Sequence, residues 1–479
     1  MQENTKSPPL LIALIPIFFL IIMLAYNVIV YGDDSLSGSN QLALLLAGGI
    51  AAVLGLKYKF TWPQMLAGIT KSISSVMPSI FILLMIGALA GTWLLSGIVP
   101  GMIYYGLQIL NPTIFLVATC IVTALVSLAT GSSWSTIATI GIALLGIGQA
   151  LGIPEAAIGG AIISGAYFGD KISPLSDTTN LAPAMAGTDL FTHIKYMMYT
   201  TVPSFVITLI LFLIIGFSYT SENAVDVQTI LNTLEASFNI NWSLFLVPAI
   251  VIFLILKKVP PIPTLLIGSI LGGIYAVIFQ PQIIEQIASG YSSYFRASYV
   301  AVVNAMTTDI SITTNNEMIN NLLSASGMYG MLNTIWLILC AMVFGGVMET
   351  TGFLHIISTN VLKMAKSTFG LFAATVGTCL GFNLTASDQY LAIVVPGKMY
   401  AEAYRKKGLA PENLSRTLED SGTVTSVLIP WNTCGATQSA VLGVATLVYL
   451  PFCFFNIISP IMTLIFAFFK IKIRPLAKD

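Results

Sequence analysis

The stretch from Ser72 to Gly169 contains a single charged residue, Glu155. A membrane-spanning helix needs about 20 mostly apolar residues, so this stretch is long enough for several crossings. The whole chain of 479 residues is 56% hydrophobic and 8% charged, whereas soluble domains carry about 25% charged residues. We therefore expect an all-α polytopic membrane protein that lies in a lipid bilayer.

Composition and motifs exclude several classes of function. The formal net charge is zero, and the chain contains no Walker loop, glycine-rich dinucleotide motif or metal-spaced His/Cys cluster. We therefore expect no nucleic acid partner, no ATP-driven step and no cofactor. The five cysteines are irregularly spaced in apolar segments, as small core residues are. The two histidines, His193 and His355, lie far along the sequence from the serine-rich patches, so no hydrolase triad is supported and we expect no enzyme.

Apolar runs predict about ten transmembrane helices. Two of them, at 155–189 and 412–444, are interrupted by polar residues and are expected to be broken helices. The first apolar run, at 10–31, is too long for a signal-peptide core, so we expect it to remain in the protein as the first transmembrane helix. The full crossings are expected at 10–31, 41–56, 77–96, 196–219, 242–256, 262–279, 329–351 and 448–469.

Basic residues predict the orientation, because Lys and Arg accumulate in cytoplasmic loops. With the N-terminus in the cytoplasm, every basic residue except Lys171 and Arg296 falls on the cytoplasmic side. The expected outer loops, 32–40 and 221–241, contain acids and no basic residue. We therefore expect a multi-pass protein of the bacterial inner membrane with both termini in the cytoplasm.

A weak internal repeat divides the chain. In each half a Pro-Gln pair, a glycine-flanked heptapeptide, a small polar patch, a Pro-Glu helix start and a proline-centred polar patch follow in the same order. The charge rule gives the halves opposite orientations, so we expect two inverted-topology repeats, 1–220 and 242–479, joined by an outer linker at 221–241. Such repeats place a transporter's site near the bilayer midplane. The second half also carries an extra polar stretch, 294–328, whose role the sequence does not indicate.

Two small polar patches, at 130–136 and 381–389, predict re-entrant hairpins whose tips lie inside the membrane. Interrupted backbone at that depth is tolerated only where it lines a cavity or is buried in protein. Two ordinary crossings joined by a short loop remain the alternative, because a hairpin and a pair of crossings change sides equally. The candidate ligands at the tips are Ser132, Ser133, Ser135, Thr136, Asn383, Thr385, Ser387 and Asp388.

Proline-centred patches at 170–180 and 430–437 interrupt the two broken helices. Proline removes a backbone donor and frees carbonyls, and the carbonyls, hydroxyls and carboxylates together are hard oxygen ligands that suit sodium. We expect sodium at Asp177, Ser133, Thr178 and Asn180, although Asp177 as a helix cap and Asp170 paired with Lys171 remain alternatives. The candidate ligands at the breaks are Asp170, Ser173, Asp177, Thr178, Thr179, Asn180, Asn432, Thr433 and Thr437.

Two further groups are expected to be structural. Glu419 and Asp420 lie two turns past Glu412, so we expect Arg416 or water at the cytoplasmic edge to satisfy them. His193, at a turn between Asp189 and Lys195, is expected to be an exposed loop residue.

The run GDKISPLSDTTNLAPAMAGTDLFTHIKYM at 169–197 and the run GSSWSTIATIG at 131–141 resemble the NhaC family of sodium/proton antiporters. The resemblance extends over nearly the whole chain. It implies exchange of sodium for protons at a site built from hairpin tips and broken helices, here 132–136 and 173–180. The family is broad, and some members exchange malate against lactate together with sodium and protons.

Our functional prediction is antiport by competition, in which one buried carboxylate binds either sodium or a proton. Asp177 is the first candidate and Asp170 the second. The alternative is a sodium- and proton-coupled exchanger of small organic acids or amino acids, and a passive channel is a further one. The expected partners are sodium, protons and the lipid bilayer, with a small organic anion and a homodimeric second copy left open.

Overall fold

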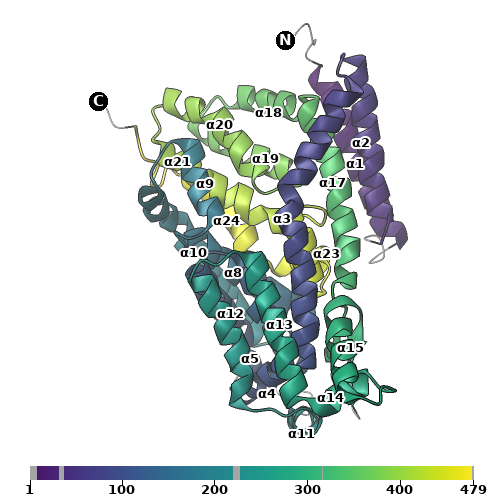
Figure 1. The fold of residues 1–479 in the computed structure, drawn as a ribbon. Helices are drawn as coiled ribbons and strands as arrows, with labels where there is room; N and C mark the ends of the chain where they lie inside the picture. The colour runs from purple at the N-terminus through teal and green to yellow at the C-terminus, as the bar shows by residue number, and fades with distance from the viewer. Residues whose placement is uncertain (1–7, 32–36, 110, 220–226, 315–316, 477–479) are drawn as a thin grey trace.

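The computed structural model describes residues 8–31, 37–109, 111–219, 227–314 and 317–476, and most of them are helical (Figure 1). Within this part of the chain, nine helices are long and apolar enough to cross a membrane, or up to eleven spans if each bent pair counts as one. The prediction of an all-α polytopic membrane protein is confirmed. Two-residue strands, β1 (Ile310–Ser311) and β2 (Ser324–Ala325), pair in antiparallel fashion within the stretch 294–328.

The α-helices follow in chain order: α1 (Leu10–Tyr31), α2 (Ser39–Lys57), α3 (Trp62–Leu95), α4 (Ile98–Ile109), α5 (Pro112–Thr130), α6 (Ser133–Thr136), α7 (Ile142–Ala150), α8 (Glu155–Ile172), α9 (Asp177–Ala186), α10 (Leu190–Gly216), α11 (Val227–Ser237), α12 (Leu246–Leu256), α13 (Pro261–Phe279), α14 (Pro281–Ile287), α15 (Tyr294–Thr307), α16 (Glu317–Leu322), α17 (Leu332–Thr350), α18 (Phe353–Met364), α19 (Thr368–Thr385), α20 (Leu391–Lys406), α21 (Pro411–Leu418), α22 (Thr433–Leu442), α23 (Thr446–Tyr449) and α24 (Phe454–Phe468). Single π-helical turns lie at Ile137–Gly141 and Glu419–Thr423.

Local signals in the sequence set the ends of the helices around the first polar patch. Asn111 caps α5 by accepting a hydrogen bond from the backbone N–H of Thr113 at 2.9 Å, and Pro112 fills the first helical position. Gly131 ends α5 with a φ of 71°, a left-handed conformation that suits glycine. Ser132 then caps α6. Because α7 returns to pack against α4, next to the start of α5, the two arms form a hairpin.

Both predicted helix breaks are present. In the first half α8 ends at Ile172 and α9 begins at Asp177, with Pro174 between them. In the second half α21 continues into the π-helical turn, and the chain then leaves the helix before α22 begins at Thr433. Proline explains the first break directly, because it cannot donate to the carbonyl four residues earlier.

Some expected boundaries are wrong. The crossing expected at 448–469 is divided, because residues 448–452 belong to the segment Thr446–Phe452 and α24 starts only at Phe454. The segment Thr446–Phe452 is itself bent by 90° from α22. The crossing expected at 77–96 is the second part of α3, which runs over 34 residues. The segment 220–226 of the expected outer linker lies outside the described residues, and α11 occupies most of the remainder.

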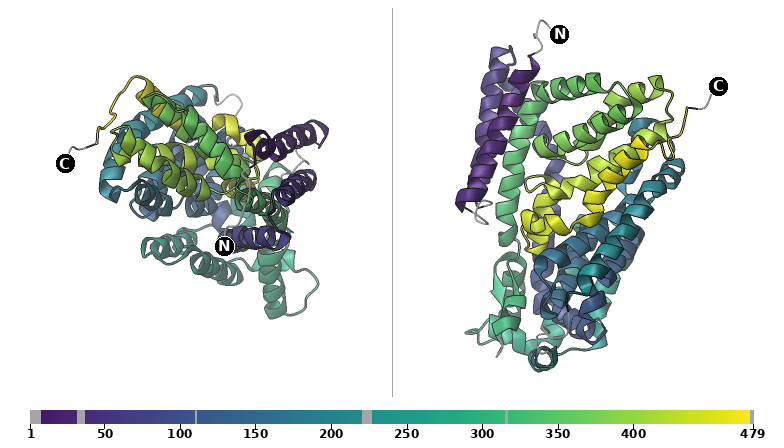
Figure 2. Two further views of the ribbon diagram at one scale, coloured as in Figure 1. Left: turned by 90° about the horizontal axis from the view of Figure 1, so that it is seen from above. Right: turned by 180° about the vertical axis from the view of Figure 1, so that it is seen from behind.

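The helices are arranged so that the two hairpins lie in opposite halves of the molecule (Figures 1 and 2). The α19–α20 pair lies in the upper half of Figure 1, whereas α5 rises from the lower end beside α4. α1 packs on α2 and α18, and α2 packs along α17, which in turn packs on the long α3. Opposite placement of the hairpins is what inverted repeats require, and the repeat itself stays a prediction.

Small residues let α5 and α8 approach closely. A Cβ atom added at Gly165 would lie 2.1 Å from the carbonyl oxygen of Cys120, and one at Gly169 would lie 2.2 Å from that of Ala124. Ser127 also donates a hydrogen bond across the interface to the carbonyl of Ala166 at 2.6 Å. This contact, typical of helix pairs in membranes, fixes the first broken helix against an arm of the first hairpin.

We predict that Gly165→Ala destabilises the protein by about 1–3 kcal/mol, because the new methyl group collides with the backbone of α5. Gly377 in α19 is the matched control, since an added Cβ there meets nothing within 4 Å. Gly377→Ala should be neutral or slightly stabilising, because alanine favours the helix. Thermal unfolding in detergent measures both, and equal midpoints for the two variants would contradict the close contact.

Candidate functional site

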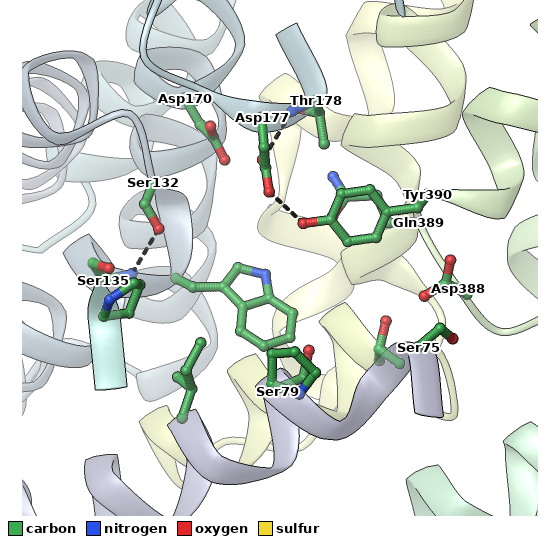
Figure 3. A pocket seen from close by; sticks show the side chains of 15 residues that line it. Ser75, Ser79, Ser132, Ser135, Asp170, Asp177, Thr178, Asp388, Gln389 and Tyr390 are labelled. Carbon is green, nitrogen blue, oxygen red and sulfur yellow. Dashed lines mark hydrogen bonds between the residues drawn. The ribbon is translucent and has the colours of Figure 1, made fainter. Parts of the chain in front are cut away.

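A cavity of about 370 Å³ lies where the two halves of the chain meet (Figure 3). Elements from both halves line it: the first hairpin tip, the first helix break, the second hairpin tip and the start of α22, together with one face of α3. The lining residues are Ser75, Pro78, Ser79, Ile82, Ser132, Trp134, Ser135, Asp170, Asp177, Thr178, Pro261, Asp388, Gln389, Tyr390 and Thr433.

Asp170 lies in the last turn of α8 and is held by the first hairpin tip. Its Oδ2 accepts hydrogen bonds from the hydroxyl of Ser133 at 2.6 Å and from the Ser133 backbone N–H at 3.1 Å. Its Oδ1 is buried and has no hydrogen-bond partner among the described residues. One carboxylate oxygen is therefore fixed while the other is left for a ligand.

Asp177 is the first residue of α9, across the break from Asp170. The phenolic hydroxyl of Tyr390 donates a hydrogen bond to Asp177 Oδ2, which joins the first helix break to the second hairpin (Figure 3). The cap of α9 is Ser176, whose hydroxyl accepts from the backbone N–H of Thr179. Asp177 therefore faces the cavity from a helix start whose capping position is filled by another residue.

The second half contributes a third carboxylate. Asp388 Oδ1 accepts a hydrogen bond from the backbone N–H of Leu391 at 2.9 Å, at the start of α20. The preceding residue, Ser387, has a left-handed φ of 58°, and its carbonyl accepts the backbone N–H of Thr433 at 3.0 Å. The second hairpin tip and the start of α22 are thus joined directly beside the cavity.

The electrostatic character of the cavity favours a cation. Its lining contains three carboxylates and no Lys, Arg or His side chain. The C-terminal end of α8 adds partial negative charge, while the start of α9 adds partial positive charge close to Asp177. The described residues contain no cluster of three or more carboxylate, imidazole or thiol ligands tight enough to chelate a metal.

The other expected ligands of the first half support the backbone. The hydroxyl of Thr179 donates to the carbonyls of Asp170 and Lys171 at 3.2 and 3.0 Å and so closes the open end of α8. The amide of Asn180 donates to the carbonyl of Ser176 at 2.6 Å. The hydroxyls of Ser173 and Thr136 donate to the carbonyls of Leu128 and Ser132 at 2.8 and 2.9 Å, respectively.

In the second half, expected ligands also donate hydrogen bonds to backbone carbonyls. The amide of Asn383 donates to the carbonyl of Gly422 at 2.8 Å, and that of Asn432 donates to the carbonyl of Asn383 at 3.1 Å. Thr385 donates to the carbonyl of Gly381 at 2.6 Å. These residues and Thr437, which is buried, do not line the cavity, so as ion ligands they stay predictions.

Several cavity residues were missed by the sequence reasoning. Ser75 and Ser79 come from α3, an ordinary crossing in the sequence, where the spacing of two serines around Pro78 is the available signal. Gln389 and Tyr390 follow Asp388 directly in the second hairpin. Aromatic residues in a transmembrane segment carry no signal for a site, and Tyr390 is identified only by its contact with Asp177.

The expectation for Glu419 and Asp420 is wrong. Asp420 is fully buried and forms an ion pair with Lys171, so Lys171 does not pair with Asp170. Thr200, Ser459 and Thr463 also donate hydrogen bonds to Asp420. The partners of Asp420 come from α8, α10 and α24, so this ion pair lies among the helices and not at an edge of the bundle.

The expectation for His193 is also wrong. Its side chain is fully buried in α10, and Nδ1 lies 2.8 Å from the hydroxyl of Ser415. Arg416 is fully buried as well, and its guanidinium lies over the ring of Tyr196, 4.6 Å from the centroid. α21 therefore enters the protein interior almost from its start.

Comparison with known proteins identifies relatives over nearly the full length. Residues 165–471 match the model of the Na⁺/H⁺ antiporter family. The Na(+)/H(+) antiporter NhaC of Alkalihalophilus pseudofirmus is 39% identical over 424 residues, which cover 88% of this chain and 89% of the relative. The malate-2H(+)/Na(+)-lactate antiporter of Bacillus subtilis is 36% identical over 432 residues, 89% of each chain. The arginine/ornithine antiporter ArcD of Halobacterium salinarum is 34% identical over 475 residues, 97% of this chain and 93% of the relative.

The cavity lining predicts a pattern of chemical labelling. A cysteine at position 79 should react with a small, membrane-impermeant thiol reagent, because the thiolate forms only where water reaches it. Ser269→Cys is the control, since Ser269 is fully buried and lies outside the cavity. The native cysteines are all buried, so the background should be low. Labelling is measured by mass spectrometry. If the cysteine at position 79 reacts no more than the buried control, the cavity is not accessible to the reagent.

Proposed function

This chain belongs to the Na⁺/H⁺ antiporter family, and on that premise we propose that it is a secondary antiporter that exchanges sodium for protons. The observation that carries the proposal is the cavity between the two halves, with carboxylates at both ends of a helix break and no basic side chain in its lining. Such a lining attracts either a small cation or a proton. The membrane is the bacterial inner membrane, with both termini in the cytoplasm.

Exchange follows from competition for the same carboxylate. Burial favours the neutral, protonated form of a carboxylate, whereas a bound sodium ion favours the ionised form. Asp177 is the first candidate because it faces the cavity and accepts a hydrogen bond from Tyr390. Its side chain is exposed, contrary to the expectation of a buried carboxylate, so the effect of burial applies to Asp170. Asp170, with one oxygen free, is the second. Thr178 adds a hydroxyl beside Asp177, and Asn180 lines the adjoining hollow.

Alternating access is possible because the cavity lies between two groups of helices. α3 and the start of α13 form one wall, through Ser75, Ser79 and Pro261. The hairpin tips and helix breaks form the other. Movement of the hairpin and broken-helix elements against α3 would therefore open the cavity to one side and then to the other.

A sodium- and proton-coupled exchanger of organic solutes is the second candidate. The cavity and an adjoining hollow of about 520 Å³ share Ser132, Ser135, Asp177 and Pro261, and together they exceed the space that one ion needs. Lys258 lines the adjoining hollow and could pair with a carboxylate of a solute. The named substrates of two relatives, malate with lactate and arginine with ornithine, are solutes of fitting size.

We predict that Asp177→Asn abolishes sodium-driven proton movement in everted vesicles, because the amide cannot exchange a proton for sodium. A pH-sensitive dye measures the response to added sodium. Glu402→Gln is the control, since Glu402 is exposed and pairs only with Lys406 on the surface of α20. Full exchange by Asp177→Asn would remove Asp177 from the mechanism and leave Asp170 and Asp388 as the remaining carboxylates of the cavity.

Transport of labelled solutes separates the two candidate functions. Purified protein in vesicles should move ²²Na⁺ against a proton gradient with no solute present. Labelled malate, lactate, arginine and ornithine, each with and without a sodium gradient, should show no coupled uptake. Sodium movement that requires one of these solutes would favour the exchanger of organic solutes instead.

A further inference from the structure

A second buried polar group lies behind the cavity and takes no part in its lining. It consists of Lys171 in the last turn of α8, Asp420 in the π-helical turn, and three hydroxyls around Asp420 from α10 and α24. Lys171 also donates to the hydroxyl of Ser459 at 2.9 Å. The positive and negative charges of the pair balance, and their polar atoms have partners. The Lys171–Asp420 pair therefore needs no further ion or hydrogen-bond partner.

Glu419 lies next to Asp420 in the chain, and its carboxylate oxygens lack hydrogen-bond partners among the described residues. Its side chain is fully buried. Thr423, four residues on, is close enough to interact with Glu419, but its hydroxyl is not in hydrogen-bond geometry and has no partner itself. A π-helical turn is rare and is frequent at functional sites, where it displaces side chains from the regular helical positions.

The charges around Glu419 leave no cation for it. Lys171, Asp170 and Asp420 all interact with it electrostatically, and the one positive charge among them is already paired with Asp420. Arg416, one turn earlier, is directed to the rings of Tyr196 and Phe466 and forms no ion pair with Glu419 within the described residues.

Among the described residues, the remaining titratable groups on the neighbouring helices do not pair with Glu419 either. Lys398, Arg405 and Lys406 of α20 are exposed, whereas Glu419 is fully buried. His193 of α10 contacts Ser415 and interacts with Lys171 and Asp420, while Cys379 of α19 and Tyr404 of α20 are neutral groups. Asp177 of α9 is a further acid. An ionised Glu419 would thus be an unpaired buried charge, which has a large free-energy cost, whereas the neutral acid fits the site.

We propose that Glu419 is a second proton-binding site of the antiporter, in addition to the cavity carboxylate for which sodium and protons compete, and that it is coupled to the cavity through Asp170. The proposal rests on the exchange of sodium for protons proposed above. The step is simple: the carboxylate of Glu419 takes up one proton from water when its side of the protein is open, and it releases that proton to water on the other side.

Sodium binding in the cavity and proton binding at Glu419 oppose each other. When sodium leaves the cavity, the uncompensated charge of Asp170 strengthens proton binding at Glu419. When sodium binds beside Asp170, that charge is compensated and the proton is released more easily. By linkage, a proton on Glu419 must weaken sodium binding by the same factor.

Infrared difference spectroscopy tests the protonation directly. The purified protein at neutral pH should show the carbonyl stretch of a protonated carboxylic acid, and this band should disappear in Glu419→Gln. Glu419→Asp should keep a shifted band, because it retains the acid. Glu412→Gln is the matched control on the same helix, since Glu412 is paired with Arg474, and it should keep the band unchanged. A band that persists unchanged in Glu419→Gln overturns the proposal.

Sodium binding at two pH values tests the coupling. The ratio of apparent sodium dissociation constants at acid and alkaline pH should fall about fivefold or more in Glu419→Gln, and Glu419→Asp should restore part of it. An unchanged ratio overturns the proposal. If wild-type vesicles exchange sodium for protons while the band or the ratio is unaffected in Glu419→Gln, the proposal fails and the function stands. If wild-type vesicles show no exchange, both fail.

Discussion

A helix that is interrupted inside a membrane protein must find new partners for the backbone groups that the interruption frees, because lipid offers none. In this protein the partners come from neighbouring polar side chains and from the other half of the chain. The hydroxyl of Thr179 closes the end of α8, and the carbonyl of Ser387 accepts the backbone N–H of Thr433. The indole of Trp431 donates to the carbonyl of Leu384 at 2.8 Å. The cavity persists because its walls are held by these bonds.

That constraint explains which part of the site could be predicted. Patches of Ser, Thr, Asn and Asp in apolar sequence mark the breaks, because only such residues can satisfy freed backbone groups. The sequence pattern does not show which of these residues face the cavity and which bind backbone carbonyls. Thr178 lines the cavity and Thr179, its neighbour, binds two carbonyls, because the direction in which the chain leaves the break decides between them. Composition and hydropathy were enough for the membrane fold and for the order of the helices.

Contacts that depend on packing could not be predicted. Lys171 and Asp420 are 249 residues apart, and no local signal connects them. Counting turns from Glu412 predicts that Glu419 lies at the cytoplasmic edge, but the segment 470–476 covers the start of α21. Arg474 pairs with Glu412 at 2.6 Å, and its carbonyl accepts the backbone N–H of Ala410. With that cover in place, α21 begins inside the protein and its acids are buried.

The end of α8 relates the cavity to the buried pair. Asp170 lines the cavity and Lys171, the next residue, binds Asp420, so two adjacent side chains of one helical turn serve two separate polar groups. Because Thr179 ties the carbonyls of both residues to α9, any movement of the break carries both side chains together. An ion in the cavity and a charge in the buried group would thus act on the same rigid turn, which would couple the cation cavity to Glu419 in addition to the competition at the cavity carboxylate.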